Sequence, residues 1–235
     1  MPLKTLTDWF DQVHVINCIH RPNRLEAFKE HIVNTGIADL SKINIYHGVS
    51  GYHVGCPPYW KYGPGAWGCL QSHRRLAEDV MGGHFNLLEF LPKRVLSYLV
   101  LEDDVFFVDG ALEMLNEFME DVPDDWGQLY LGGQHRRTPL ATASLNVIEG
   151  ASINRLHAYA VHERNFLDFY AHISNAPDYI GKKNHHIDHQ VENAHRRKLW
   201  KVYCPAKWIA GQRAGISDIC RMALEDRTWN PSPLN

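Results

Sequence analysis

The chain has 235 residues, of which 45% are hydrophobic, enough to form the core of one large domain. Its 24 Lys and Arg residues nearly balance 27 Asp and Glu, for a formal net charge of −3, so only a local basic patch could favour nucleic acid. The five cysteines form no CxxC pair, which indicates free thiols in a reducing compartment. Because the sequence contains no signal-peptide core and no apolar window of about 20 residues, we expect no membrane span and a cytoplasmic protein.

Strand-like and helix-like segments alternate along the first part of the sequence. Apolar runs predict strands at 13–18, 43–46, 96–105 and 128–131, and helical spacing predicts helices at 25–33, 66–81 and 110–119. Glycines are expected to end several of these elements, at Gly36, Gly82 with Gly83, and Gly132 with Gly133. This alternation predicts an α/β fold, in which a mostly parallel twisted sheet is flanked by helices on both faces.

The pattern changes after about residue 136. Strands are expected at 145–148, 157–161 and 200–203, and helices at 163–174 and 184–197, the second of which is polar and rich in histidine. The sequence contains no internal repeat and no low-complexity linker. It therefore predicts a single domain over residues 1–235 with two halves, at about 13–135 and about 136–220.

Three carboxylates, Glu102, Asp103 and Asp104, end the apolar run that begins at Leu96. Adjacent acids at the mouth of a buried strand repel one another and lose hydration unless a cation is bound. Mg²⁺ and Mn²⁺ are held by one or two carboxylates and keep positions open for phosphate oxygens. The run thus predicts a metal–diphosphate site, with a solvated acidic turn as the alternative. Because alternate residues of a strand share a face, Glu102 and Asp104 are the expected metal side.

Polar side chains also follow the first predicted strand. An α/β sheet binds nucleotides beyond the carboxyl ends of its strands. We therefore expect Arg21 and Arg24 to contact a nucleotide and Asn17 to contact its base or ribose. A plain surface role is the alternative for the two arginines.

The tripeptide His-Arg-Arg occurs three times, at 73–75, 135–137 and 195–197. Arginine can bind phosphate through two parallel hydrogen bonds, so Arg74 or Arg136 could hold an anionic substrate. The alternative is a solvated helix end, which we favour for the third copy.

Aromatic residues gather in and just after the Gly/Pro-rich connection 48–65: Tyr59, Trp60, Tyr62 and Trp67. Such rings either stack on a sugar or an unpaired base, or they pin a long loop as a small satellite core. Since long irregular connections are often functional, we expect Trp60 and Trp67 to contact a substrate.

Several segments resemble, in order, the motifs of glycosyltransferase family 25, which includes lipooligosaccharide and collagen galactosyltransferases. Val15-Ile16-Asn17 with 21–24 is similar to the opening N-L-x-R-x-x-R, and 63–73 is similar to G-x-x-G-C-x-x-S-H. Segment 101–105 resembles the metal motif L-E-D-D, 129–133 resembles the strand Y-L-G, and 217–219 resembles a C-terminal S-D-I element. Segments 187–190 and 211–215 depart from the family pattern.

The resemblance implies a GT-A fold, which is Rossmann-like, and transfer of a sugar from a nucleotide-sugar donor, with UDP as the expected nucleotide. It also implies Mn²⁺ or Mg²⁺ as the cofactor and inversion at the anomeric carbon. The first half would then bind the nucleotide sugar and the second half the acceptor. The expected metal ligands are Asp104, Glu102 and Asp218. The expected donor-binding residues are Asn17, Arg21, Arg24, Ser72, His73, Glu102, Asp103 and Gln212.

An inverting transfer needs a general base that deprotonates the acceptor hydroxyl. Asp188 lies among histidines in the second half, where the family tends to place an aspartate, so we expect it to be this catalytic base. An ordinary acid in the first turn of a helix is the alternative. His185 and His189 have the spacing of a zinc pair, but no third ligand is apparent in the sequence. The expected acceptor-binding residues are Trp60, Trp67, Arg74 and Arg136.

Two classes of function fit these features. The first is a glycosyltransferase whose acceptor is a saccharide or, as an alternative, a hydroxymethylated base in DNA, as in phage-type DNA modification. The arginine triplets and the aromatic loop favour DNA, whereas the near-neutral charge disfavours it. The second class is a catalytically inactive nucleotide-sugar-binding module, which need not retain Asp104 and Asp188.

Overall fold

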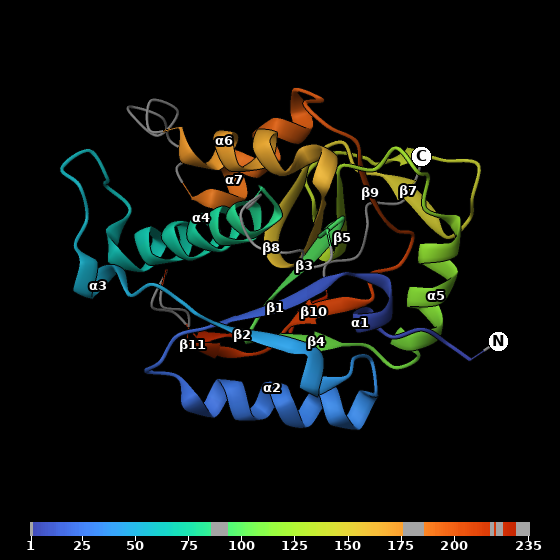
Figure 1. Ribbon diagram of the computed structural model, residues 1–235, viewed down its shortest axis with the longest axis horizontal. Helices are drawn as coiled ribbons and strands as arrows, with labels where there is room; N and C mark the ends of the chain where they lie inside the picture. Colours follow the sequence, from blue (N-terminus) through green and yellow to red (C-terminus); the bar gives the residue numbers. More distant parts are fainter. Residues whose placement is uncertain (1, 86–93, 176–185, 217–218, 220–222, 229–235) are drawn as a thin grey trace.

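The computed structural model describes residues 2–85, 94–175, 186–216, 219 and 223–228. One sheet of eight strands forms its centre, in the spatial order β2-β1-β3-β8-β5-β9-β7-β6 (Figure 1). The strands are β1 (Gln12–Asn17), β2 (Ile43–His47), β3 (Ser97–Glu102), β5 (Gln128–His135), β6 (Leu140–Ala141), β7 (Val147–Glu149), β8 (Ile153–His162) and β9 (Val202–Pro205). No helix of the described residues is both long enough and apolar enough to cross a membrane.

Most strands of this sheet point the same way. Strand β1 is parallel to both β2 and β3, and β5 is parallel to β9. Strands β8 and β7 run against the others, with β8 inserted between β3 and β5. The predicted fold class, a mostly parallel sheet flanked by helices, is confirmed.

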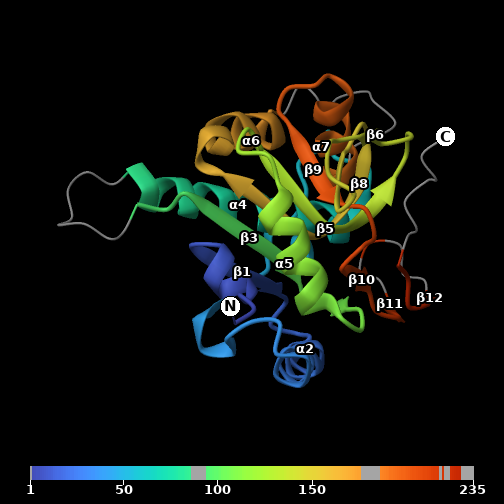
Figure 2. The ribbon, with the colours of Figure 1, turned by 90° about the vertical axis from the view of Figure 1, so that its right-hand side faces the viewer.

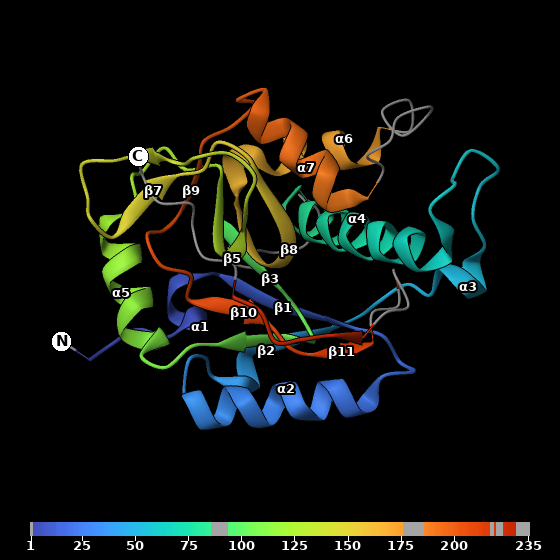
Figure 3. The same ribbon diagram turned by 180° about the vertical axis from the view of Figure 1, so that it is seen from behind.

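Helices cover both faces of the sheet, as Figures 1 and 3 show. One face carries α4 (Gly63–Phe85), α6 (Phe166–Ser174) and α7 (Ile187–Arg196), and the other carries α1 (Leu6–Trp9), α2 (Pro22–Thr35) and α5 (Ala111–Asp121). A hydrophobic core lies on each face of the sheet, because successive side chains of a strand point to opposite faces. Tyr98 and Val100 of β3 belong to the core with α4 and α6, whereas Leu99 and Leu101 belong to the core with α2 and α5. Viewed from the side in Figure 2, the sheet separates the two helical layers.

Short elements complete the chain. They are α3 (Gly51–Val54), the 3₁₀ turns η1 (Leu40–Lys42) and η2 (Glu163–Asn165), and the strands β4 (Val105–Phe107), β10 (Ala210–Gln212), β11 (Gly215–Ile216) and β12 (Ala223–Leu224). Strand β10 pairs antiparallel with β4, and β11 pairs antiparallel with β12. The pairing of β10 returns the C-terminal part of the chain to the end of β3, where the acidic residues lie.

Two elements continue through glycines that were expected to end them. Helix α4 runs past Gly82 to Phe85, and β5 runs past Gly132 and Gly133 to His135. A helical glycine costs only about 1 kcal/mol, which packing can offset. In β5, a Cβ at Gly132 would overlap the carbonyl oxygen of Ala210 and the ring of His157, so this glycine serves a close approach of β10 and not a turn.

The course of the first three strands creates a switch point. From β1 the chain goes to β2 on one side and then to β3 on the other side of β1. In open α/β sheets, ligands bind beyond the carboxyl ends of the strands at such a point. Here these ends are Asn17 of β1 and Glu102 of β3.

Candidate functional site

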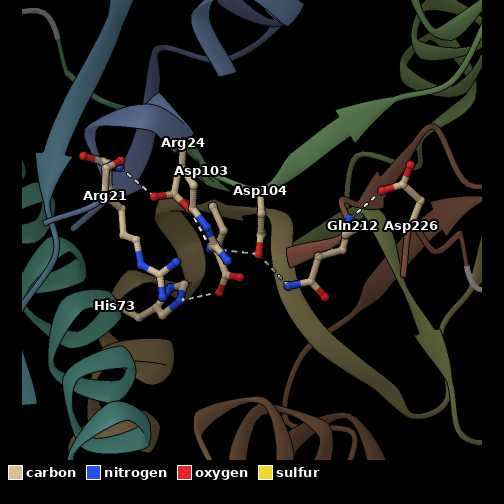
Figure 4. A network of polar contacts seen from close by, with 10 residues as sticks. Arg21, Arg24, His73, Asp103, Asp104, Gln212 and Asp226 are labelled. Carbon is tan, nitrogen blue, oxygen red and sulfur yellow. Dashed lines mark hydrogen bonds and ion pairs between the residues drawn. The ribbon is translucent and has the colours of Figure 1, made fainter. Parts of the chain in front are cut away.

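The acid turn, defined here as Glu102, Asp103 and Asp104, lies at this switch point. Strand β3 ends at Glu102, and the other two acids form the turn that leads into β4. All three side chains are largely removed from solvent, with 26%, 9% and 14% of their surface exposed. Figure 4 shows Asp103 and Asp104 among side chains that include Arg24 of α2, His73 of α4 and Gln212 of β10.

Asp103 is held by residues that follow β1. Its Oδ2 accepts a hydrogen bond of 2.7 Å from Asn17 Nδ2, and its Oδ1 lies 3.2 Å from Arg24 Nη1. Asn17 Nδ2 also donates to the carbonyl oxygen of Arg21 over 3.1 Å. Asn17 thus fixes both the acid turn and the start of α2.

Asp104 joins the turn to the C-terminal part of the chain. Its Oδ2 lies 3.3 Å from Arg24 Nη1 and accepts a hydrogen bond of 3.2 Å from Gln212 Nε2. Its carbonyl oxygen accepts a backbone hydrogen bond of 2.7 Å from Arg213. Its Oδ1 is buried and has no hydrogen-bond partner among the described residues. Oδ1 of Asp104 is therefore available to a ligand.

Glu102 contacts the opposite wall of the site. Its Oε1 lies 3.3 Å from Nε2 of His73 on α4, and Nδ1 of that histidine lies 3.0 Å from the hydroxyl of Tyr159 on β8. If Nε2 carries the proton and donates to the carboxylate, Nδ1 accepts from the tyrosine. His73 is thereby fixed between the sheet and the acid turn.

The acid turn carries more negative charge than its neighbours neutralise. Burial raises the pKa of Asp103, and burial together with the charge of Glu102 raises the pKa of Asp104. For Glu102 burial alone would raise the pKa, but the hydrogen bond with His73 and the charges of His73, His157 and Arg24 together outweigh burial and lower it. One guanidinium, that of Arg24, serves two carboxylates. A bound cation would relieve this repulsion.

The residues present fit a hard divalent ion. Asp104 Oδ1 is an unpartnered buried oxygen beside a second carboxylate, Glu102, and carboxylate oxygens are the donors that Mg²⁺ and Mn²⁺ take. The third expected ligand, Asp218, lies outside the described residues. Glu102 also belongs to a second possible group of metal ligands, one that would suit a softer ion, because one donor atom each of Cys69, His73 and Glu102 lie within 4.8 Å of one another. Burial raises the pKa of the Cys69 thiol, which disfavours the thiolate that such a set needs.

Two cavities meet at the acid turn. The smaller, with a volume of about 150 Å³, lies over the ends of β1 and β3 and the start of α4, and is lined by residues that include Arg21, Arg24, Ser72, His73 and all three acids. The larger, with a volume of about 400 Å³, lies between β8 and α7 and is lined by residues that include Asp188 and Arg136. Their common wall is formed by residues that line both cavities: Cys69, Glu102, Gln212, Arg213 and Ile219.

The structure brings most of the expected donor residues together. Arg21, Arg24, Ser72, His73, Glu102, Asp103 and Gln212 all line the smaller cavity. The Ser72 hydroxyl already donates to the carbonyl oxygen of Gly68 and accepts from the amide of Val49. Asn17 lies behind this cavity and acts on Asp103. Its expected contact with a base or ribose stays a prediction.

The expected acceptor residues are divided. Asp188, in the first turn of α7, and Arg136 line the larger cavity. Trp60, Trp67 and Arg74 line neither cavity. Trp60 is 6% exposed, its Nε1 donates to the carbonyl oxygen of Gly63, and its ring packs on Trp67 at a centroid distance of 5.2 Å. Trp60 thus forms part of a small core that pins the loop, which was the alternative to the expected contact with a substrate.

Several lining residues were not expected from the sequence. Asn154, Arg155 and His157 of β8 and the later Arg227 line the larger cavity, and Arg213 lines both. Residues 157–161 have the apolar pattern of a buried strand, which carries no sign of a binding role. Arg213 directly follows Gln212, an expected donor-binding residue, and this adjacency was the one feature of the sequence that could have indicated a role for Arg213.

None of the cysteines among the described residues forms a disulfide bond. Cys18, Cys56, Cys69 and Cys204 are free thiols, in agreement with the expectation. Cys220 and His185 lie outside the described residues, so the zinc pair proposed for His185 and His189 is not tested.

Comparisons with known proteins found likenesses in structure only. No family model matches the sequence, and no curated protein matches it. A glycosyltransferase that takes part in glycosylation of the major capsid of PBCV-1 has 10% identity and a TM-score of 0.38, over 71% of this chain and 67% of that one. The inositol-1-phosphate CTP transferase of T. maritima has 9% identity and a TM-score of 0.39, over 83% and 85%. The CTP:phosphocholine cytidylyltransferase of Streptococcus pneumoniae has 10% identity and a TM-score of 0.39, over 86% and 92%.

These three structures are of a glycosyltransferase and of two nucleotidyltransferases. At such low sequence identity, a similar fold does not identify the reaction that a protein catalyses, because proteins of one fold have many different functions. The resemblance to glycosyltransferase family 25 is not confirmed by these comparisons and stays a prediction.

Proposed function

We propose that this protein is a metal-dependent glycosyltransferase that moves a sugar from a nucleotide-sugar donor to the hydroxyl of a saccharide. The observation that carries the proposal is the pair of cavities that meet at the acid turn. A direct transfer needs a donor and an acceptor to lie on opposite sides of one carbon atom. Two adjoining cavities with different polar groups meet this need.

The smaller cavity would hold the diphosphate of the donor. Arg21, Arg24 and Arg213 line it, and guanidinium groups match phosphate oxygens in geometry and charge. It lies at the switch point of the sheet, where α/β folds bind nucleotides. UDP-sugars are the first donors to test, as the resemblance to family 25 implies.

Asp104 and Glu102 would hold Mn²⁺ or Mg²⁺ beside this diphosphate. The ion would neutralise the charge that develops on the leaving nucleoside diphosphate. Asn17 and Arg24 keep Asp103 turned toward β1, and Gln212 holds one oxygen of Asp104. These contacts leave the second oxygen of Asp104 available.

Asp188 would act as the general base from the larger cavity. Its carboxylate accepts the proton of the acceptor hydroxyl as that oxygen bonds to the anomeric carbon, and the bond from this carbon to the diphosphate breaks. The base and the leaving group then lie on different sides of the reacting carbon, so the configuration inverts. Asp188 Oδ1 accepts from the amide of His189 over 2.9 Å, a contact that orients the side chain.

The first test is of the metal site. We expect a screen of nucleotide sugars with Mn²⁺ to find a donor that raises the Tm, because a ligand that binds only the folded state stabilises it. Asp104→Ala should abolish this metal-dependent shift and sugar transfer, while unfolding stays cooperative. Asp109→Ala, a change of an exposed aspartate a few residues away, is the matched control. Transfer by Asp104→Ala, or full activity of the wild type in excess EDTA, would contradict the proposal.

The second test is of the base. Asp188→Asn should retain affinity for the donor but lower kcat by about 100-fold or more, the scale of losing a general base. Single-turnover rates at saturating donor measure this effect. If donor affinity is lost and the rate at saturating donor survives, Asp188 belongs to the donor site. Donor binding by the wild type without any transfer would instead indicate a nucleotide-sugar-binding module.

A further inference from the structure

Two candidate metal ligands lie on one face of α4 beside the acid turn. Cys69 and His73 are four positions apart, so their side chains lie one helical turn from each other. One donor atom of each, and one carboxylate oxygen of Glu102 on β3, all lie within 4.8 Å of one another. Thiolate sulfur, imidazole nitrogen and carboxylate oxygen are the donors that bind zinc in proteins. The contact between α4 and the end of β3 thus brings together a set of zinc donors from two elements.

The ring of His73 is oriented as the ring of a metal ligand usually is. Its Nε2 faces Glu102, 3.3 Å from Oε1, and its Nδ1 lies 3.0 Å from the hydroxyl of Tyr159. A metal-bound histidine donates a hydrogen bond from its other ring nitrogen, which fixes the ring and its tautomer. The hydroxyl of Tyr159 can accept this hydrogen bond as well as donate one. An ion at Nε2 would therefore leave the contact with Tyr159 in place.

The three donors can be reached from the cavities, although the side chain of His73 is only 1% exposed. Cys69 and Glu102 line both cavities, and His73 lines the smaller one. Zinc in proteins is usually tetrahedral, so three protein donors leave one position for water or another ligand. The set therefore has the composition of an open zinc site, and a cavity supplies the route to it.

Metal binding at these donors exchanges a proton for an ion. Burial keeps the Cys69 thiol neutral in the metal-free protein. A thiol that coordinates zinc loses its proton to solvent, because the charge of the ion stabilises the thiolate. The excess negative charge of the acid turn attracts any divalent ion to this place. Mg²⁺ gains little from a thiolate, so the set selects a softer ion.

We infer that Cys69, His73 and Glu102 form a second metal site, which binds Zn²⁺ or the similar ion Co²⁺. This site is distinct from the hard-ion site proposed at Asp104, and the two share Glu102. Binding of the ion does not depend on the proposed sugar transfer. One consequence does rest on the proposed function: Zn²⁺ takes the carboxylate of Glu102 that the Mg²⁺ or Mn²⁺ site needs, and so inhibits the transfer.

Titration of the metal-free, reduced wild-type protein with Co²⁺ alone tests the site directly. A cobalt ion that is bound to thiolate absorbs in the near ultraviolet, and a tetrahedral cobalt ion absorbs strongly in the visible range. We expect both bands to saturate at an equimolar amount of Co²⁺. Zn²⁺ has a filled d shell and no such bands, so its addition should remove them as it displaces Co²⁺.

Variants then assign the bands to the three donors. Cys69→Ser should remove the near-ultraviolet band and weaken Co²⁺ binding by at least about 10-fold. Tyr159→Phe should retain this band but weaken binding by about 10-fold, the scale of losing a partner that orients a metal-bound histidine. Cys56→Ser is the matched control, because Cys56 is an exposed free thiol, and it should change neither quantity.

A measurement on the wild type keeps the test independent of how the variants fold. Bound Zn²⁺ should slow the reaction of Cys69 with iodoacetamide, mapped by mass spectrometry, and should leave the reaction of Cys56 unchanged. The absence of a thiolate band, a band that survives in Cys69→Ser, or a band that is lost in Cys56→Ser would overturn the inference. Equal protection of the two thiols by Zn²⁺ would do the same.

Inhibition of transfer tests the shared use of Glu102. In saturating Mg²⁺, the Zn²⁺ concentration that halves the rate should be at least about 10-fold higher for Cys69→Ser than for wild type, each compared with its own rate without Zn²⁺. Equal inhibition of both proteins would contradict the sharing. If no donor supports any transfer, the proposed function fails, whereas the cobalt bands and the protection of Cys69 still decide whether the metal site exists.

Discussion

Glu192 is a carboxylate that keeps its charge although little of it reaches solvent. Burial by itself raises the pKa of this group, but hydrogen bonds from His189 and Ser152 and the charge of Arg196 outweigh burial and lower it to about 2. Asn154 Nδ2 donates to its second oxygen over 3.2 Å. Through these contacts one residue of α7 fixes three side chains beside the larger cavity.

Glu192 should therefore contribute to stability in a way that depends on pH. Its pKa is lower in the folded than in the unfolded chain, so its contribution is complete above about pH 4.5 and disappears as the pH falls toward about 2. The difference between wild type and Glu192→Gln in free energy of unfolding should reach about 3 kcal/mol at most near pH 7 and shrink on acidification. Urea unfolding at a series of pH values measures it. A difference that stays constant down to pH 3 would contradict this account.

At the scale of elements, the bulge in β8 determines what the larger cavity can bind. A regular strand would present only every second residue to this side of the sheet. Where two steps along β5 span four residues of β8, the bulge lets the consecutive residues Asn154 and Arg155 both line the cavity, together with His157. Burial lowers the pKa of His157 to about 4, so this ring is neutral near pH 7. The strand thus supplies the charged Arg155 and the neutral Asn154 from adjacent positions.

Glycine should suit position 155 better than alanine does. Both changes remove the guanidinium group, but only glycine adopts a φ of 81° without strain. We expect Arg155→Gly to be more stable than Arg155→Ala by about 1 kcal/mol, measured as the difference in thermal or urea unfolding. The same pair of changes at Arg136, which has no positive φ, should favour alanine. Equal stability of the two variants at 155 would mean that its backbone relaxes.

The elements that the sequence predicted well are those with a strong local pattern. Strands β1 and β3 and helix α5 have apolar runs or amphipathic spacing, and packing agrees with these signals. The errors occurred at Gly82, through which helix α4 continues at a small cost in free energy, and at Gly132, where a distant contact decides that the strand continues. Gly132 lies against Ala210, a residue that no local pattern connects to it.

The same division holds for the site. The acid turn and Arg24 were predictable, because both follow apolar strands whose carboxyl ends meet in an α/β sheet. Arg155 and His157 were not, since a bulge depends on the pairing of β5 with β8 and not on the composition of either strand. Trp60 looked exposed in a Gly/Pro-rich loop, yet its partners Tyr62 and Trp67 bury it.

At the scale of the whole molecule, the two halves of the chain share one sheet. Strand β8, from the second half, pairs with both β3 and β5 of the first half, and β9 pairs with β5. Tyr130 and Tyr159 pack on each other across this junction at a centroid distance of 6.3 Å. Neither half therefore has a complete sheet of its own.

A fragment that ends at His135 should fail to fold cooperatively. It would retain β2, β1 and β3, but β5 would lose both neighbours and expose their apolar contacts. The full chain, by contrast, should unfold in one transition, with circular dichroism and tryptophan fluorescence coinciding. Two separate transitions, or a cooperative melt of the fragment, would show that the halves are independent.

The order of strands in space also governs how the site is assembled as the chain is made. Gln12 of β1 pairs with Tyr98 of β3, so at a synthesis rate of roughly 5–20 residues per second β1 waits several seconds for its partner. The acid turn then waits again for Gln212 and Arg213, which follow more than a hundred residues later. A nascent chain that carries the three acids but not β10 holds the Asp104 side chain through Arg24 alone. Under the proposed function, we therefore expect full nucleotide affinity only after Gln212 and Arg213 are made. Such late completion would keep partly made chains from competing with finished protein for the donor.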